Sequence, residues 1–513
     1  MNKLLKYLSY FLILTVIWIV ALKITFPLPD ISKRIDSLAL ASDPSTTLGK
    51  IFSDAHTHHP NKTGVLPLIS GNDALGSRLI LAKQAQKSID IQYYIWHDDL
   101  SGNLLLKALY DASLRGVKIR LLLDDNGIHG LDNILTSLNA LDNFEIRIFN
   151  PSMIRSPKIL GYSFDFLRMN RRMHNKSFIV DGAVAIIGGR NVGDEYFQVG
   201  EKSFFIDLDV IGVGKIVPKT ASAFDEYWNS QSAYEIESFI TTIGNLKTFL
   251  SNTSKANSSP GNTALSKSIN TSAERLIAKK MSLEWTDVEL VFDNPLKGLG
   301  KVQEDQLLIE QMMSMIGEVK HKIDLVSAYF IPGKKGSSYF SKLANDSKKI
   351  RILTNAMATT DVLMVHAGYS KYRRELLSSG VDLYELKLNN VIEKKKNDFL
   401  SGSNASLHAK TFAIDNNRIF IGSFNFDPRS VFLNCEMGFL IHSSKLALQL
   451  SAAFDKPIKA NSYQPKLTPG GKMIWNEIKE GDELITYQEE PEASWFQQIS
   501  MVIIGLLPVE WLL

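Results

Sequence analysis

Short apolar runs alternate with amphipathic stretches along this chain of 513 residues. In the first half, SIDIQYYIW (88–96) and VKIRLLL (117–123) have the length and apolar content of buried strands. Between them, NLLLKALYDASLRG (103–116) repeats apolar residues at helical spacing and ends at Gly116. The pattern predicts a strand, a helix and a second strand in succession.

The same order returns in the second half of the chain. KIDLVSAYF (322–330) is followed by a weaker helical stretch, then IRILT (350–354), the helix HAGYSKYRRELLSSG (366–380) and VDLYEL (381–386). Strands alternating with helices are typical of α/β proteins. We expect one sheet in each half, flanked by helices.

A spaced motif also occurs once in each half. His174, Lys176, Asp181, Gly188 and Asn191 lie at offsets 0, 2, 7, 14 and 17, and the same residue types lie at the same offsets in His408, Lys410, Asp415, Gly422 and Asn425. Asp90 and Asp324, in the apolar runs upstream, are 234 residues apart, as are the two histidines. The chain therefore contains two copies of one unit of about 200 residues.

The apolar run at the N-terminus is typical of a membrane anchor. It is uncharged from Tyr7 to Leu22 and is flanked by Lys3, Lys6 and Lys23. Counted to Phe26 with Lys23 snorkelling, a helix here is about 30 Å long, the thickness of a hydrocarbon core. A cleaved signal peptide is the alternative, but its small-residue site, Ala39-Leu40-Ala41, lies far from the apolar run, so an uncleaved anchor over residues 1–28 is favoured.

The remaining segments divide the chain into domains. Residues 251–273 contain sixteen Ser, Asn, Thr, Pro or Gly among twenty-three, which indicates a linker or insertion over 246–276. We expect a first domain over 45–245, a second over 277–460 and a tail over 461–513. The hydrophobic tail end, 495–513, has Glu510 as its one charged side chain and a proline at 508 that disfavours a spanning helix. It either packs on the domain or lies in the membrane interface.

Composition limits the classes of function. The net charge is +3, so no strong basic field indicates nucleic acid as the main partner. A single cysteine, Cys435, excludes an internal disulfide framework. Of two local basic runs, EKKKND (393–398) is interpreted as a solvated loop, whereas RMNRR (168–172) abuts His174 and could equally face an anionic substrate.

The motif strand suggests a chemistry. Side chains alternate along a strand, so each histidine shares a face with the lysine two residues on, whereas Asp181 and Asp415 have the opposite parity and begin turn-like sequences. If the repeats meet about a pseudo-twofold axis, two imidazoles, two ammonium groups and two amides converge. Such a site suits a phosphate: one imidazole attacks phosphorus, the other protonates the leaving alcohol, and the lysines and amides hold the oxygens. No metal is required.

The motifs HNKSFIVDG…GGRN and HAKTFAID…GSFN resemble the paired HKD motifs of the phospholipase D superfamily. More narrowly, DIQYYIWHDDLSG, NRRMHNKSF, TTDVLMVHAGYSKYRRELL and GSFNFDPRS…LNCEMG resemble bacterial cardiolipin synthases of the C type. The resemblance implies two phospholipase D-like repeats with one active site at their pseudo-twofold interface.

The resemblance also implies residue roles. His174 would be the nucleophile that forms a phosphohistidine, and His408 the general acid and then the base. Lys176, Lys410, Asn191 and Asn425 would hold the phosphoryl oxygens, while Asp181 and Asp415 would be structural. An acid would orient each histidine, with Asp207 (or, second, Asp209) and Glu436 in the matching places. For His366, a buried structural role and a head-group contact stay equally open.

The expected function is the synthesis of cardiolipin by transfer of a phosphatidyl group to phosphatidylglycerol. Phosphatidylethanolamine is an alternative donor, and neither a cofactor nor nucleic acid is expected. Three other readings stay open: a membrane-bound phospholipase D or another phosphatidyltransferase, a nuclease, and a scaffold with a dead site. Lys3 and Lys6 favour the bacterial inner membrane with the catalytic domain on the periplasmic side, although Lys23 weakens that argument.

Overall fold

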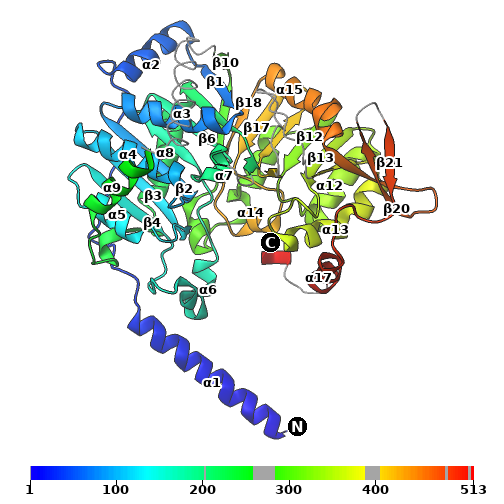
Figure 1. Ribbon diagram of the computed structural model, residues 1–513, viewed down its shortest axis with the longest axis horizontal. Helices are drawn as coiled ribbons and strands as arrows, with labels where there is room; N and C mark the ends of the chain where they lie inside the picture. The colour runs from blue at the N-terminus through cyan, green and yellow to red at the C-terminus, as the bar shows by residue number, and fades with distance from the viewer. Residues whose placement is uncertain are drawn as a thin grey trace.

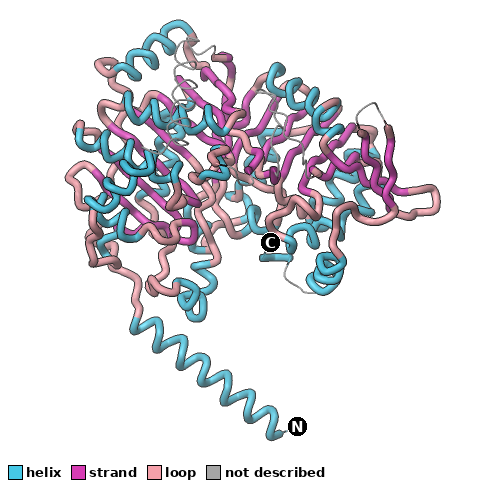
Figure 2. The backbone as a smooth tube through the Cα atoms, in the orientation of Figure 1, coloured by secondary structure: helices cyan, strands magenta, loops and turns pink. Residues whose placement is uncertain are grey.

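The structure, a computed structural model, describes residues 2–200, 204–257, 283–387, 405–479, 483–505 and 510–512. Figure 1 shows two α/β units side by side, with helix α1 (Asn2–Thr25) projecting away from both. In Figure 2 helices cover the central strands of each unit, and further strands reach the outer edge of the second unit. The predicted α/β fold with two repeats is confirmed.

The first repeat is built on a mixed nine-stranded sheet in the order β10-β1-β8-β6-β5-β2-β3-β4-β9. Its strands are β1 (Thr63–Leu68), β2 (Ser88–Ile95), β3 (Lys118–Gly127), β4 (Phe144–Phe149), β5 (Ser177–Val180), β6 (Val184–Gly188), β8 (Asp209–Gly214), β9 (Ala233–Glu235) and β10 (Glu284–Thr286). β2, β3 and β4 run parallel to one another, and the other pairs are antiparallel.

Helices connect and cover these strands. They are α2 (Thr47–His58), α3 (Gly71–Gln84), α4 (Leu100–Leu114), α5 (Asp132–Asn139), α6 (Tyr162–Met169), α7 (Asp194–Phe197), α8 (Ile216–Trp228) and α9 (Leu246–Asn257). α4 begins after Asp99, whose carboxylate accepts the Gly102 N–H at 2.9 Å. It ends before Gly116, whose φ of +88° suits the left-handed turn that glycine favours.

The second repeat has a ten-stranded sheet in the order β11-β18-β17-β16-β12-β13-β14-β19-β20-β21. Its strands are β11 (Val288–Phe292), β12 (Lys322–Ser327), β13 (Lys349–Asn355), β14 (Asp382–Leu386), β16 (Lys410–Ile414), β17 (Arg418–Gly422), β18 (Met437–Ile441), β19 (Ser462–Leu467), β20 (Met473–Ile478) and β21 (Leu484–Tyr487). Its helices are α11 (Leu308–Ile316), α12 (Gly333–Asn345), α13 (Leu363–Ser378), α14 (Pro428–Phe432), α15 (Ser444–Asp455), α16 (Pro457–Ala460) and α17 (Trp495–Gly505).

The internal duplication extends to three-dimensional detail. Trp96 bridges Val192 in the first repeat, and Phe330 bridges Phe426 in the second, again at a shift of 234 residues. The motif aspartates, both with positive φ, lie in the β5–β6 and β16–β17 hairpin turns. Asp181 accepts backbone N–H groups from residues 86–88, and Asp415 accepts those of residues 320–322. Each carboxylate fixes the start of the neighbouring central strand, β2 or β12.

The two repeats share a continuous interface. One apolar cluster includes residues of both sheets, among them Ile187 and Val210 from the first and Ile421 and Phe439 from the second. A separate two-stranded sheet joins β7 (Phe204–Ile206) to β15 (Ala405–Leu407). β7 ends directly before Asp207 and β15 directly before His408, so this pairing brings candidate site residues of the two repeats together.

Three segments differ from the domain boundaries expected from sequence. Leu246–Asn257, interpreted as linker, forms α9 and packs on α4 and α5 with Phe249 buried. Residues 284–286, assigned to the second domain, form β10 and pair with β1 of the first sheet. Part of the expected tail forms β19, β20 and β21, which extend the second sheet. The remaining insertion and the basic run 393–398 lie outside the described residues.

The hydrophobic end of the chain packs on the second repeat. α17 lies against α13, and the short helix at Glu510–Leu512 lies against α14. The Glu510 carboxylate accepts a 2.5 Å hydrogen bond from the Tyr372 hydroxyl. Within the described residues, α1 is the one helix that is long and apolar enough to cross a membrane.

Candidate active site

The two motif histidines lie at the interface between the repeats, each held by backbone of the other repeat. The His174 N–H donates to Cys435 O at 2.8 Å, and the His408 N–H donates to Ile206 O at 2.8 Å. Cys435 directly precedes Glu436, and Ile206 directly precedes Asp207. Each histidine therefore lies beside an acid of the other repeat.

Both acids contact a histidine across the interface. His174 Nδ1 lies 2.8 Å from Glu436 Oε2, and His408 Nδ1 lies 2.6 Å from Asp207 Oδ2. Since these contacts occupy both Nδ1 atoms, the Nε2 atoms are left for chemistry. The alternative acid, Asp209, instead makes a buried ion pair with Arg78 at 2.8 Å.

The motif lysines are buried beside the histidines. Lys176 Nζ donates to His174 O at 2.5 Å, and Lys410 Nζ lies 2.8 Å from His408 Nδ1. Burial lowers the pKa of Lys176 well below its usual value and that of Lys410 to about 8, although Asp207 and Glu436 oppose the shift of Lys410. An anion between the repeats would stabilise the charged form of both ammonium groups and raise the pKa of each.

Two amides complete the constellation. Asn191 accepts the Ile95 N–H at 3.2 Å through Oδ1. The Oδ1 of Asn425 is buried and finds no hydrogen-bond partner in the described part of the chain. Buried polar atoms are seldom left unpaired, so free hydrogen-bonding capacity next to two histidines fits a ligand site.

The two histidines differ in electrostatic setting. Burial, with Lys176 and Lys410, lowers the pKa of His174 well below its usual value. Burial and Lys410 also lower the pKa of His408, but there Asp207 opposes the shift. Burial raises the pKa of Glu436 to about 7, whereas His408 and Lys410 outweigh burial and lower the pKa of Asp207. The ionised acid therefore lies beside His408, which is the histidine better suited to carry a proton.

Side chains that the sequence did not identify shape the site. Tyr94 stands edge-on to His174 with ring centroids 4.9 Å apart, and Tyr196 and Phe205 lie 5.2 Å and 5.0 Å from His408. Ser423 donates to Glu436 Oε2 at 2.5 Å. Its counterpart in the first repeat is Gly189, where a Cβ would come within 2.1 Å of Asp207 Oδ1. A comparison of the two motif copies position by position would have identified this difference between Gly189 and Ser423.

Other polar groups near the motifs have structural partners. Arg172 of the basic run makes a buried ion pair with Asp124 at 2.8 Å. His366 is buried, and its Nε2 lies 2.5 Å from Glu490 Oε1 and 3.0 Å from Arg373. These contacts favour a structural role both for Arg172 of the basic run and for His366.

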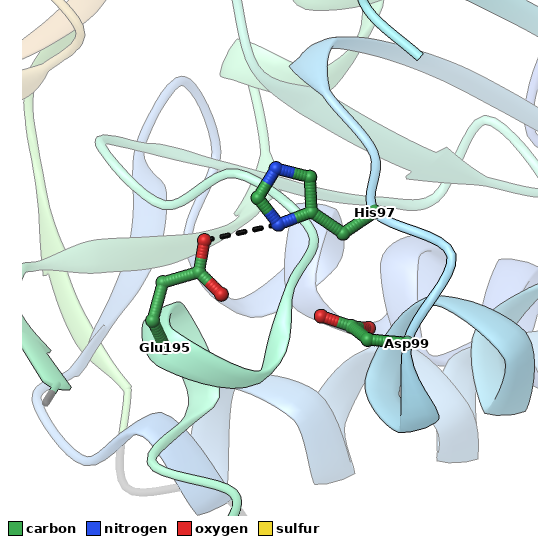
Figure 3. Close-up of side chains that lie close together, drawn as sticks. All are labelled: His97, Asp99 and Glu195. Atoms are coloured by element: carbon green, nitrogen blue, oxygen red, sulfur yellow. Dashed lines mark ion pairs between the residues drawn. The ribbon is translucent and has the colours of Figure 1, made fainter. Parts of the chain in front are cut away.

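A second cluster of titratable groups lies at the start of α4. His97, Asp99 and Glu195 converge there, as Figure 3 shows, with ligand atoms within 4.8 Å of one another. His97 Nδ1 lies 3.1 Å from Glu195, and Asp99 accepts backbone N–H groups through both oxygens, from Gly102 at 2.9 Å and Asp194 at 2.7 Å. These contacts give each group a structural role.

Comparisons with known proteins match both repeats. A family model described as "Cardiolipin synthase, PLD-like domain" matches residues 79–228 and 312–458. Cardiolipin synthase C of Escherichia coli is 40% identical over 465 residues, which cover 89% of this chain and 98% of that protein. An uncharacterized protein of Helicobacter pylori is 31% identical over 92% of this chain and 94% of its own length. The solved structure of phosphatidylserine synthase from Haemophilus influenzae has the same fold, with a TM-score of 0.55 at 13% identity, covering 90% of this chain and 100% of that one.

Proposed function

Because this chain belongs to the cardiolipin synthase, PLD-like domain family, we propose that it is a membrane-anchored phosphatidyltransferase that makes cardiolipin from phosphatidylglycerol. The observation that carries the proposal is the pairing of each motif histidine with an acid of the other repeat, at 2.8 Å and 2.6 Å. Neither repeat contains a complete site, so the two act together.

In the first step, His174 Nε2 attacks the phosphorus of a donor phosphatidylglycerol. A P–N bond forms, the P–O bond to the head-group glycerol breaks, and His408 Nε2 gives its proton to the leaving oxygen. The lowered pKa of His174 supports its role as nucleophile because a neutral imidazole has a lone pair to offer. The ionised Asp207 supports His408 as the acid because it stabilises the imidazolium.

In the second step, a hydroxyl of a second phosphatidylglycerol attacks the phosphohistidine. His408 takes the hydroxyl proton, the new P–O bond forms and the P–N bond breaks. Lys176, Lys410, Asn191 and Asn425 hold the phosphoryl oxygens in both steps. The products are cardiolipin and glycerol, and the proton lost in the first step is regained in the second.

The membrane arrangement follows from the anchor. α1 keeps the enzyme where both lipid substrates reside, and Lys3 and Lys6 support a bacterial inner membrane location with the catalytic repeats on the periplasmic side. Phosphatidylethanolamine would serve as donor in the same way, with ethanolamine as the leaving alcohol.

A head-group assay on the purified full-length protein tests the proposal. In mixed micelles of phosphatidylglycerol we expect cardiolipin and free glycerol in equal amounts, and neither from His408→Ala protein. Phosphatidic acid with no cardiolipin would identify a hydrolase instead. Cleavage of DNA with no lipid product would identify a nuclease.

A further inference from the structure

The helical layers of the two repeats differ in how tightly they close. In the first repeat α3 packs against α4, and α7 contacts both. The counterparts in the second repeat are α11, α12 and α14. α11 has 9 residues where α3 has 14, and α11 makes no comparable contact with α12 among the described residues.

A cavity of about 450 Å³ fills the resulting gap. Its wall is apolar and includes Met312, Ile316, Tyr339, Phe340, Phe424 and Phe426. Of the charged residues that line it, Glu304, Glu310, Lys334 and Lys335 are exposed, which places them at its mouth. Asp427 is buried, and its carboxylate accepts the Ser430 N–H. A cavity of this volume with an apolar wall is typical of a site that binds a small apolar group.

The equivalent position in the first repeat is occupied. There His97, Asp99 and Glu195 form the cluster of Figure 3. A shift of 234 residues leads to Ile331, Gly333 and Arg429. Ile331 and Gly333 line the cavity, and Arg429 turns away to donate to Asn170 at 3.0 Å and 2.8 Å. In the described residues, the cavity of the second repeat therefore lies where the first repeat has this polar cluster.

The cavity wall is continuous with the active-site segment. Phe424 and Phe426 line the cavity on either side of Asn425, whose unpaired Oδ1 belongs to the site. The Ile331 N–H donates to Phe426 O at 2.6 Å, which ties the start of α12 to the same segment. A ligand in the cavity would therefore contact the two residues that flank one proposed to hold phosphate.

One apolar residue of the cavity wall is exposed at the surface of the molecule. Phe432 of α14 lines the cavity and is 54% exposed. Arg429 of α14 contacts Asn170 beside α6 and Leu512 O at the chain end. Figure 1 shows α6, α14 and α17 on the side from which α1 leaves, and side chains exposed there include Leu167, Trp495 and Ile499.

We propose that the cavity between α11, α12 and α14 binds one acyl chain of a phospholipid substrate whose phosphate lies between His174 and His408. The inference rests on the proposed function, because it takes the substrate to be a phospholipid. The first repeat, whose corresponding layer is closed, leaves the other chains in the bilayer.

Gly336 offers a way to fill the cavity. It lies on the cavity side of α12. Apart from its chain neighbours and the backbone of its own helix, the described atom that a Cβ built there would approach is Pro332 Cβ at 3.0 Å. Gly336→Leu should lower kcat/KM for dioleoyl phosphatidylglycerol by about tenfold through lost burial of methylene groups. It should leave kcat/KM for dihexanoyl phosphatidylglycerol within about twofold, because six-carbon chains depend less on that burial. The matched control, Lys342→Leu, places the same side chain at an exposed position of α12 that does not line the cavity, and it should behave like the wild type with both lipids.

Met313→Trp, which fills the cavity from α11, should reproduce the selective loss if Gly336→Leu does not fold. Equal losses with both lipids in folded protein, or no loss with the dioleoyl lipid, would overturn the proposal. A phosphatidylglycerol with a diazirine at one chain end provides a readout without turnover. It should label residues 308–316 or 333–345 in the wild type and not in Gly336→Leu protein. Labelling without cardiolipin formation would refute the proposed function alone, and cardiolipin formation without labelling of these helices would refute the chain site alone.

Discussion

Replacing Asp207 by Asn changes the proton balance of His408 without changing the shape of the side chain. Asp207 Oδ1 accepts the Leu208 N–H at 2.8 Å, and Oδ2 faces His408 Nδ1 at 2.6 Å. In the variant, the Leu208 N–H still needs an acceptor, so the amide oxygen of Asn takes the place of Oδ1. The NH₂ group then faces Nδ1 and fixes the imidazole proton on Nε2.

That tautomer can serve as neither acid nor base in the proposed steps. The imidazolium would place its Nδ1–H against an NH₂ group, and the neutral ring has no lone pair on Nε2. Loss of the charge-assisted hydrogen bond alone corresponds to about 1.5–3 kcal/mol, or roughly 10- to 200-fold in rate. The tautomer change brings the expected fall in kcat to about 10³- to 10⁴-fold, as for the same substitution in a Ser-His-Asp triad.

The assay is cardiolipin formation in mixed micelles of phosphatidylglycerol at saturating lipid. The matched control is Asp361→Asn, which removes a charge that acts on His408 from a distance while the carbonyl still accepts from Tyr329. We expect the control to stay within about threefold of the wild type. A kcat for Asp207→Asn within tenfold of the wild type would refute the assignment of Asp207 as the residue that orients His408.

Further outcomes follow from the same structure. Activity should survive excess EDTA, because lysines and amides supply the charge stabilisation; complete loss restored by one divalent ion would contradict this. Protein without residues 1–28 should move partly to the soluble fraction and keep its activity on mixed micelles, since both repeats remain; a folded but inactive product would place the segment in the site. Burial raises the pKa of Asp427 to about 6, so the folded state loses about 2–3 kcal/mol as pH rises from 3.8 through 6. Asp427→Asn, which can still cap α14, should therefore flatten the fall in unfolding temperature between about pH 4 and 6, and an unchanged slope would contradict this assignment.

Much of the site could be predicted because its groups repeat at fixed local spacing. His174 and Lys176 directly precede β5, and Asn191 follows β6 of the same hairpin, so residue offsets carry the information. The second copy distinguishes these residues from ordinary core residues. The central strands and helices were predictable for the same reason. Their periodicity and stop signals are local, as at Gly116 and Asp99.

The features that escaped prediction depend on long-range packing. β10 follows the insertion in sequence yet completes the first sheet, because its partner β1 offers a free edge. β19 and β20 alternate buried and exposed residues only weakly and become strands by joining β14. The contacts of Tyr196 and Phe205 with His408 depend on where the second repeat docks, and no offset within one repeat encodes that.

The most direct test of the central claim is lipid analysis of a bacterial host that lacks cardiolipin and expresses the full-length protein. Wild-type protein should restore cardiolipin, while His174→Ala and His408→Ala proteins, each folded and present at the wild-type level, should restore none, because both histidines serve one site. Cardiolipin at near wild-type levels from either variant would contradict the account, as would its absence with the wild-type protein.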